Sequence, residues 1–258
     1  MPRLGLGQSL TGGAVTSEAI PHSLEFDGTD DFVDLGDLTI LPDGQRYGTV
    51  SCWAYNRDNS VTASMVSKYK AASPIAKEWF FLWDSNSKAL FAAWATGYSA
   101  SSGLLHATGS ETLLEDTWYH IAGTFHPTEK NKVYINGVLR ATSTNAMAAD
   151  GLDDTTAKIY IGRNSDASYF DGFIKDVAIW DVTLTVDDLL SIYNDGTPND
   201  LTKAASYTDG SGVDRSGDLV GYWRMNEGTG VTLKDSSVSG NNGTIDGAVY
   251  STEVPPND

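Results

Sequence analysis

Apolar and polar residues alternate with a period of two along most of the chain from residue 23 onward. Val50, Cys52 and Ala54, for example, occupy every second position of one run. This is the period of a β-strand that turns one face towards a core. Short runs rich in β-branched and aromatic residues recur between turn residues, which predicts further strands. They cover residues 78–83, 88–95, 117–125, 132–135, 158–161 and 173–180.

The clearest turn in the sequence is Asn136-Gly137, which separates the apolar runs 133–135 and 138–140. Both residue types tolerate the positive φ angles that a two-residue type I′ turn requires. The sequence therefore predicts a tight β-hairpin centred on these two residues.

One short helix is predicted, over residues 186–194. Thr185 is a suitable N-cap, and Asp188 stands three residues later, where it can complete a capping box. The sequence Asn-Asp-Gly at positions 194–196 favours the end of a helix. The expected length is about three turns.

Many short strands with one short helix predict an all-β fold, a two-sheet antiparallel jelly-roll sandwich. Residues 1–22 are Gly-rich and weakly patterned, so we expect an N-terminal arm there. Residues 199–217 are polar and are predicted to form a loop, and apolar patterning returns at 219–223. We expect residues 23–258 to form a single domain.

The charge composition restricts the classes of molecule that the protein can bind. Acidic residues outnumber basic ones by 34 to 17, which gives the 258-residue chain a formal net charge of -17. A field of this sign repels phosphate backbones and anionic lipid, so we expect neither nucleic-acid binding nor membrane insertion. Divalent cations, by contrast, suit a surface rich in Asp and Asn.

Cys52 is the single cysteine, so no disulfide within the chain is possible. It lies in an apolar strand, where a thiol usually behaves as a small hydrophobic group. The N-terminal residues contain no apolar run of signal-peptide length, and no stretch approaches a transmembrane span. We therefore expect synthesis in a reducing cytoplasm.

Five stretches together resemble the laminin-G-like jelly-roll family, whose fold is concanavalin A-like. They include SLEFDGTDDFV at residues 23–33 and WYHIAGTF at residues 118–125. The order of the stretches matches the family and covers roughly residues 23–194. The other members of the set are residues 49–54, 159–163 and 170–180, and residues 133–137 belong to the stretch that begins at residue 118.

Residues 219–250 depart from the family order. They look like the family's opening strands, which usually precede the stretch at residues 23–33. Two explanations remain open: a circular permutation, in which the segment returns to complete the same sandwich, and the start of a second domain. We favour permutation, because 40 residues from Leu219 to Asp258 are too few for a second sandwich.

A narrower resemblance points to modules of tailed-bacteriophage structural proteins. It rests on the Gly-rich start, on YNDGTPNDL at residues 193–201 and on the GYWRM segment at residues 221–225. It implies a non-catalytic virion structural or adhesion module, such as a capsid decoration, tail or fibre component, displayed on the virion surface after synthesis in the host cytoplasm. The implied partners are other virion proteins or cell-surface glycans, and homo-oligomerisation stays open. The alternative is a carbohydrate-binding or cell-adhesion module of a cellular protein.

A glycoside hydrolase is the most distant alternative. Retaining hydrolases need two carboxyl groups about 5–5.5 Å apart, which alternate positions on a strand can supply. Glu25 and Asp27 superficially resemble such a pair, but Asp30 stands where those enzymes carry Glu. His120 lies on an aromatic strand without a nearby nucleophile and is interpreted as structural. We therefore expect a protein that is not an enzyme.

Calcium is the one cofactor for which the sequence offers ligands. The resemblance places a structural calcium ion near the Asp-Gly stretches, and jelly-roll loops gather at the ends of the sheets. Solvated turn carboxylates are an equally open interpretation, and Lys175 stands where many relatives carry Asp. The candidate ligands are Asp27, Asp30, Asp31 and Asp171, with the Asn241-Asn242 loop as a further source of oxygen atoms.

Aromatic side chains on neighbouring strands are a second candidate feature, because sugar rings stack on exposed aromatic faces. Trp79, Trp83, Trp94 and Tyr98 lie on or beside two predicted strands. Aromatic residues on strands mostly pack into a core, so we expect most of these side chains to be buried.

Overall fold

The computed structural model describes most of the chain from residue 21 onward. The predicted arm, residues 1–22, lies outside the described residues except for Pro21 and His22, and Tyr98 also lies outside them. The described residues are 21–41, 45, 47–70, 76–94, 104–126, 129–144, 152, 155–165, 167–208 and 212–258.

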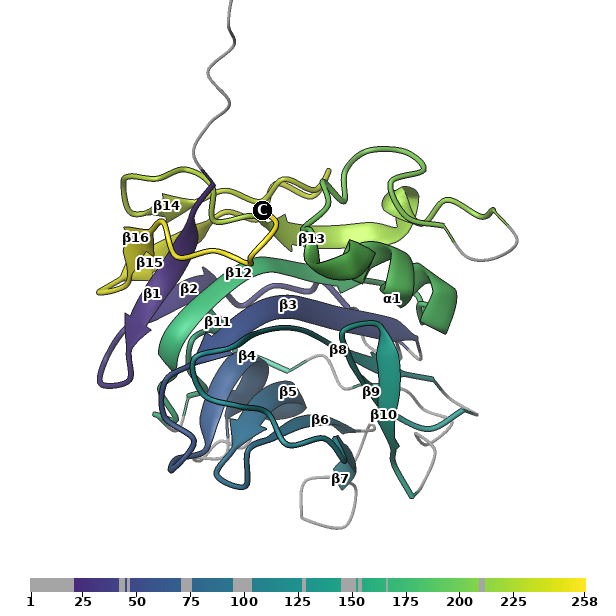
Figure 1. The fold of residues 1–258 in the computed structure, drawn as a ribbon, viewed down its shortest axis with the longest axis horizontal. Helices are drawn as coiled ribbons and strands as arrows, with labels where there is room; N and C mark the ends of the chain where they lie inside the picture. Colours follow the sequence, from purple (N-terminus) through teal and green to yellow (C-terminus); the bar gives the residue numbers. More distant parts are fainter. Residues whose placement is uncertain are drawn as a thin grey trace, which may run out of the picture.

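Two antiparallel sheets face each other (Figure 1), as the alternating pattern predicts. The first sheet, sheet A, has the order β10 (Val138–Thr142), β9 (Lys132–Ile135), β8 (Trp118–Phe125), β3 (Gly48–Asn56), β12 (Asp171–Trp180), β1 (Ser23–Asp27) and β16 (Val249–Ser251). An eighth strand, β13 (Leu219–Trp223), pairs with β12 beside β1.

The second sheet, sheet B, also contains eight strands. Its order is β14 (Thr232–Leu233), β15 (Gly243–Asp246), β2 (Phe32–Gly36), β11 (Ile159–Ile161), β4 (Ala63–Lys70), β5 (Ala76–Asp84), β6 (Lys88–Trp94) and β7 (Leu104–Thr108). The all-β two-sheet sandwich is therefore confirmed.

The hydrophobic core lies between the sheets and receives alternate residues of each strand. Val50, Cys52 and Ala54 of β3 are fully buried in it, which confirms the period of two. Trp79 and Trp83 of β5 are buried in the same cluster, as expected of strand aromatics.

The hairpin at Asn136-Gly137 is confirmed. Asn136 has φ 51° and Gly137 has φ 74°, and Ile135 pairs with Val138 across the turn. Both φ angles are positive, as a type I′ turn requires.

The predicted helix is α1 (Val186–Tyr193), one residue shorter than expected. Thr185 and Asp188 form the capping box, and Asn194 ends the helix in the left-handed conformation at φ 45°. The buried face of α1 covers part of the outer face of sheet A (Figure 1). Two short 3-10 helices, η2 (Asn194–Gly196) and η3 (Ser216–Asp218), follow, and no described helix is long and apolar enough to cross a membrane.

The polar segment 199–217 contributes more to packing than its composition predicts. Leu201 and Tyr207 are buried against sheet A together with Trp180. The Trp180 Nε1 donates a hydrogen bond to the Tyr207 hydroxyl at 2.8 Å. Two apolar residues therefore anchor an otherwise polar loop to the outer face of the sheet.

The segment 219–251 supplies strands to both sheets. In sheet A, β13 pairs with β12 and β16 pairs with β1, while in sheet B β15 joins β14 to β2. Trp223, Met225 and Leu233 are fully buried in the main core. The two sheets are therefore built from both ends of the described chain.

Candidate functional site

Three carboxylates gather in the tight turn between β1 and β2. β1 ends at Asp27 and β2 begins at Phe32, and Gly28 makes the reversal possible with φ 74°. Ligand oxygen atoms of Asp27, Asp30 and Asp31 all lie within 4.8 Å of one another. The structure thus brings together three of the four aspartates that the sequence suggested for calcium.

The turn's own backbone holds these carboxylates in place. The Asp27 Oδ1 accepts hydrogen bonds from the backbone N–H groups of Thr29 at 2.8 Å and Asp30 at 3.3 Å, and the first of these lowers the pKa of Asp27. The Asp31 Oδ2 accepts from the backbone N–H of Asp27 at 3.0 Å. Burial, followed by the negative charge of Asp27, raises the pKa of Asp31. A cation at the turn would therefore relieve an unfavourable concentration of charge.

The donor set fits a hard divalent cation. Calcium takes six to eight oxygen ligands, and carboxylates, carbonyls and waters are its usual donors. Asp27 and Asp31 each accept backbone hydrogen bonds through one carboxylate oxygen, which leaves their second oxygens and the Asp30 carboxylate for a metal. The remaining coordination positions would be filled by carbonyl groups or water.

Asp171, the fourth predicted ligand, has a different role. It lies opposite Asp27 in the register of β1 and β12, but its Oδ1 accepts a hydrogen bond from the Arg57 Nε at 2.7 Å. The Arg57 Nη1 donates to the Glu25 Oε1 at 2.6 Å. Asp171 and Glu25 therefore both bind Arg57, which directly follows β3 and links it to β12 and β1. Asp171 is not one of the three clustered carboxylates.

The remaining residues named for calcium also have local partners. The Asn241 carbonyl accepts from the Trp223 Nε1 at 2.9 Å, and the Asn242 Oδ1 accepts from the Asp235 N–H at 3.0 Å. Lys175 is 1% exposed and forms an ion pair with Asp258 at 3.0 Å. These contacts stabilise the C-terminal segment.

An open groove adjoins the acidic turn. It has a volume of about 490 Å³ and runs between residues 228–231 and residues 245–250. Gly247 lines the groove, and a Cβ added there would fall 1.9 Å from the Asp31 Oδ1, so this carboxylate lies directly against the Gly247 backbone. The groove and the turn are therefore neighbours. The groove could not be predicted from the sequence, because it depends on Gly247, which lies more than 200 positions from Asp31, and the positive φ angles of Gly228, Gly230 and Gly247 are visible only in the structure.

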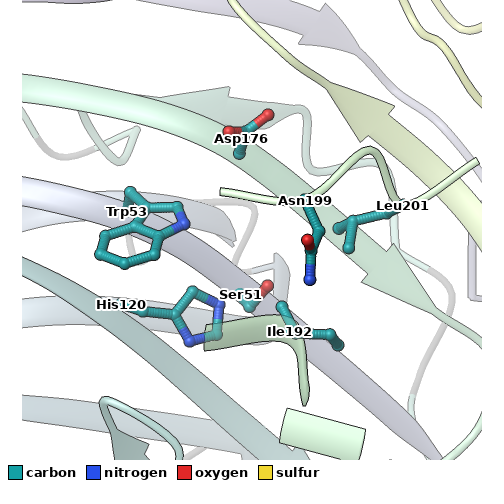
Figure 2. Close-up of a pocket in the computed structure, with 7 residues that line it drawn as sticks. All are labelled: Ser51, Trp53, His120, Asp176, Ile192, Asn199 and Leu201. Atoms are coloured by element: carbon teal, nitrogen blue, oxygen red, sulfur yellow. The ribbon is translucent and has the colours of Figure 1, made fainter. Parts of the chain in front are cut away.

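A second cavity lies between the outer face of sheet A and the segments that cover this face, α1 and the loop after it (Figure 2). Ser51, Trp53 and His120 face it from the sheet, and Ile192 faces it from α1. Its volume of about 10 Å³ is the space of roughly one water molecule, so it excludes a sugar.

His120 at this cavity has the properties of a structural residue. It is 2% exposed, and its ring lies 5.3 Å from the ring of Trp53. Burial lowers the pKa of His120 to about 3, so the imidazole is neutral at physiological pH. An imidazole that is enclosed cannot reach a substrate, and a low pKa makes it a weak general base.

The two antiparallel sheets define a jelly-roll-type β-sandwich. A family profile described as the concanavalin A-like lectin/glucanases superfamily, of the laminin-G type, matches residues 27–190, more than half of the chain. The chain therefore belongs to the concanavalin A-like lectin/glucanases superfamily, which confirms the family resemblance in the sequence. The narrower resemblance to bacteriophage modules stays a prediction.

Two solved structures are similar over most of the chain. A protein from Bacteroides ovatus, provisionally described as a carbohydrate binding protein, has a TM-score of 0.65 and 18% identity over 92% of this chain. A heptameric SAP-like pentraxin from Limulus polyphemus has a TM-score of 0.50 and 14% identity, over 69% of this chain and 84% of the pentraxin. At such identities the likeness shows a shared fold. This chain spans 62% of the length of the Bacteroides ovatus protein, and no curated protein sequence matches it.

Proposed function

We propose that this protein is a non-catalytic adhesion module that binds glycans in the groove beside the acidic turn. The observation that carries the proposal is the contact between Gly247, which lines the groove, and Asp31 of the carboxylate cluster. A calcium ion held by the cluster would lie beside the groove. Sugar hydroxyl groups can then replace water among the oxygen ligands of the ion.

The surroundings of the groove suit a neutral sugar. Val231 and Val249 line it and are 66% and 55% exposed, so they offer apolar surface to the C–H face of a pyranose. A net charge of -17 does not oppose the approach of an uncharged glycan. The Bacteroides ovatus protein that shares this fold is provisionally described as a carbohydrate binding protein, which supports a glycan as the class of ligand.

The biological setting we propose is the surface of a virion, where the module would serve as a capsid decoration, tail or fibre component. Its support is the resemblance of residues 193–201 and 221–225 to tailed-bacteriophage modules. The alternative setting is a cellular carbohydrate-binding or cell-adhesion protein. Co-purification with assembled virions supports the first setting, and a gene surrounded by polysaccharide-utilisation functions supports the second.

A glycan array in millimolar calcium is expected to reveal sugar binding without turnover. Val249→Trp should weaken that binding by about tenfold or more, because the indole fills part of the groove and removes about 1.4 kcal/mol or more of binding free energy. Val238→Trp is the matched control, since Val238 is 99% exposed and does not line the groove. An array without any bound glycan would overturn the proposal. So would release of reducing sugar that disappears in Glu25→Gln, because that result would identify an enzyme.

Calcium is expected to raise the melting temperature. A ligand present at about 100 times its dissociation constant adds about 2.7 kcal/mol to the free energy of unfolding. For a chain of this size that corresponds to roughly 5–11 °C. Asp31→Asn should abolish the shift, whereas Asp195→Asn, at an exposed position outside the turn, should keep it. Identical melting curves in chelator and in millimolar calcium would remove calcium from the proposal.

A further inference from the structure

Arg163 lies in an aromatic cluster that the groove and the acidic turn do not use. Its guanidinium carbon is 4.0 Å from the ring centre of Phe32, 4.3 Å from that of Tyr160 and 5.7 Å from that of Tyr169. The Arg163 Nη1 donates a hydrogen bond to the Tyr169 hydroxyl at 3.1 Å. The three rings come from β2, β11 and the loop after β11, so separate segments fix the orientation of one cation.

The charge of Arg163 has no carboxylate partner in the part of the chain that the structure describes. Each of the other four described arginines forms an ion pair with Asp or Glu, at 2.6 to 3.4 Å. These pairs are Arg57 with Glu25 and Asp171, Arg140 with Glu111, Arg215 with Asp218, and Arg224 with Asp200. Acidic residues outnumber basic ones by 34 to 17, so a partner would be easy to supply. An arginine left without one is therefore informative.

The hydrogen-bonding capacity of Arg163 is also incompletely used. Its Nε is buried and has no hydrogen-bond partner among the described residues, whereas the rest of the guanidinium is hydrogen-bonded to the side chains of Tyr160 and Tyr169. Stacking on aromatic rings accounts for the position of the side chain, but an aliphatic residue would fill the same space without the cost of partial desolvation of a charge. A guanidinium held flat with unused donors matches a planar anion that accepts two hydrogen bonds.

The neighbouring basic residue does not compete for such an anion. The Lys158 Nζ lies 2.7 Å from the Asp34 Oδ2, so that lysine is already paired. The site therefore offers one positive charge, bordered by the partly exposed rings of Phe32 and Tyr169. In a chain of net charge -17, one isolated cation favours a short acidic oligosaccharide over a long, densely charged polymer.

We propose that Arg163, with Phe32, Tyr160 and Tyr169, binds a carboxylate-bearing sugar such as a uronic acid residue. The carboxylate pairs with the Nη groups of Arg163, and the apolar face of the pyranose packs on the exposed aromatic surface. The inference rests on the proposed function in that the ligand is a glycan. It adds a second site, separate in its residues from the groove, and it names the chemical class of sugar.

The test uses the full chain and titrates it with trigalacturonic acid, with the neutral analogue galactotriose and with a singly sulfated galactoside. Titrations are made by calorimetry in the presence of a chelator, so that calcium bridging at the acidic turn does not contribute. Arg163→Met keeps an unbranched apolar side chain on the rings. It should lower the affinity for trigalacturonic acid by about tenfold or more, because a hydrogen-bonded charge pair is lost. Arg163→Lys should also weaken it, because an ammonium lacks the planar fork.

Arg140→Met is the matched control, because Arg140 is similarly exposed but already paired with Glu111 at 2.7 Å. It should leave the affinity unchanged, and melting curves should verify that every variant is folded. Equal affinity of the parent chain and Arg163→Met for trigalacturonic acid overturns the inference, as does an absence of binding. If the sulfated galactoside binds more strongly than trigalacturonic acid, the proposal that the ligand's anionic group is a carboxylate is wrong. The two proposals can fail separately. If Val249→Trp weakens the binding of a neutral glycan and Arg163→Met changes no glycan binding, the proposed function stands and the acidic-sugar site is wrong.

Discussion

A chain that ends at residue 218 is expected to be unfolded or aggregated. Such a truncation removes β13 from β12, β16 from β1 and β15 from β2, so both sheets gain an open edge. It also removes Trp223, Met225 and Leu233, which are fully buried in the main core. Size-exclusion chromatography and near-ultraviolet circular dichroism would measure the loss of the compact, packed state.

A point substitution separates packing from the loss of whole strands. Trp223→Ala should lower the free energy of unfolding by about 3–5 kcal/mol, because a fully buried indole leaves a large cavity. Its Nε1 also donates to the Asn241 carbonyl at 2.9 Å, and this acceptor would lose its partner. A soluble truncated chain that melts cooperatively at the full-length temperature would instead identify residues 219–258 as a separate appendage.

Local signals were the part of the fold that could be predicted well from the sequence. Asn136-Gly137 specifies its own turn by the φ angles its residues tolerate, and Thr185 with Asp188 specifies the start of α1 by capping. Both signals lie within a few residues of the structure they determine. The period of two likewise predicted which face of β3 enters the core.

Contacts between distant segments could not be predicted in the same way. Asp171 was a reasonable calcium ligand by residue type, but its partner Arg57 is 114 positions away, and only the pairing of β3 with β12 brings them together. Tyr207 lies in a polar loop and gains its buried environment from Trp180 on β12. A one-dimensional pattern contains no information on such pairs when each residue has several plausible partners.

The candidate site shows the same division. Asp27, Asp30 and Asp31 are close in sequence, and a short turn keeps their carboxylates together whatever the rest of the chain does. The groove depends on Gly247, which lies more than 200 positions from Asp31 and meets it because β15 pairs with β2. The acidic turn was therefore predictable and the groove was not.

The glycine at position 172 is expected to be indispensable for the pairing of β12 with β3. Its φ is 141°, and a Cβ added there would lie 1.9 Å from the Tyr55 carbonyl oxygen, a backbone atom that cannot rotate away. Gly172→Ala should therefore force the two strands apart beside the bond from the Arg57 N–H to the Asp171 carbonyl. The expected loss in the free energy of unfolding is about 3–5 kcal/mol, from backbone strain and overpacking together. Equilibrium unfolding in urea would measure it.

Gly212→Ala is the control that isolates the conformational part of this cost. Gly212 also has a positive φ, 82°, but no atom of the described residues lies within 4 Å of its added Cβ. That substitution should cost only the left-handed strain of an L-residue, about 1–2 kcal/mol. The difference between the two variants then reports the steric contact at Tyr55. If both variants lose the same stability, strands β3 and β12 can separate locally without penalty, and the close approach at Gly172 is not a determinant of the fold.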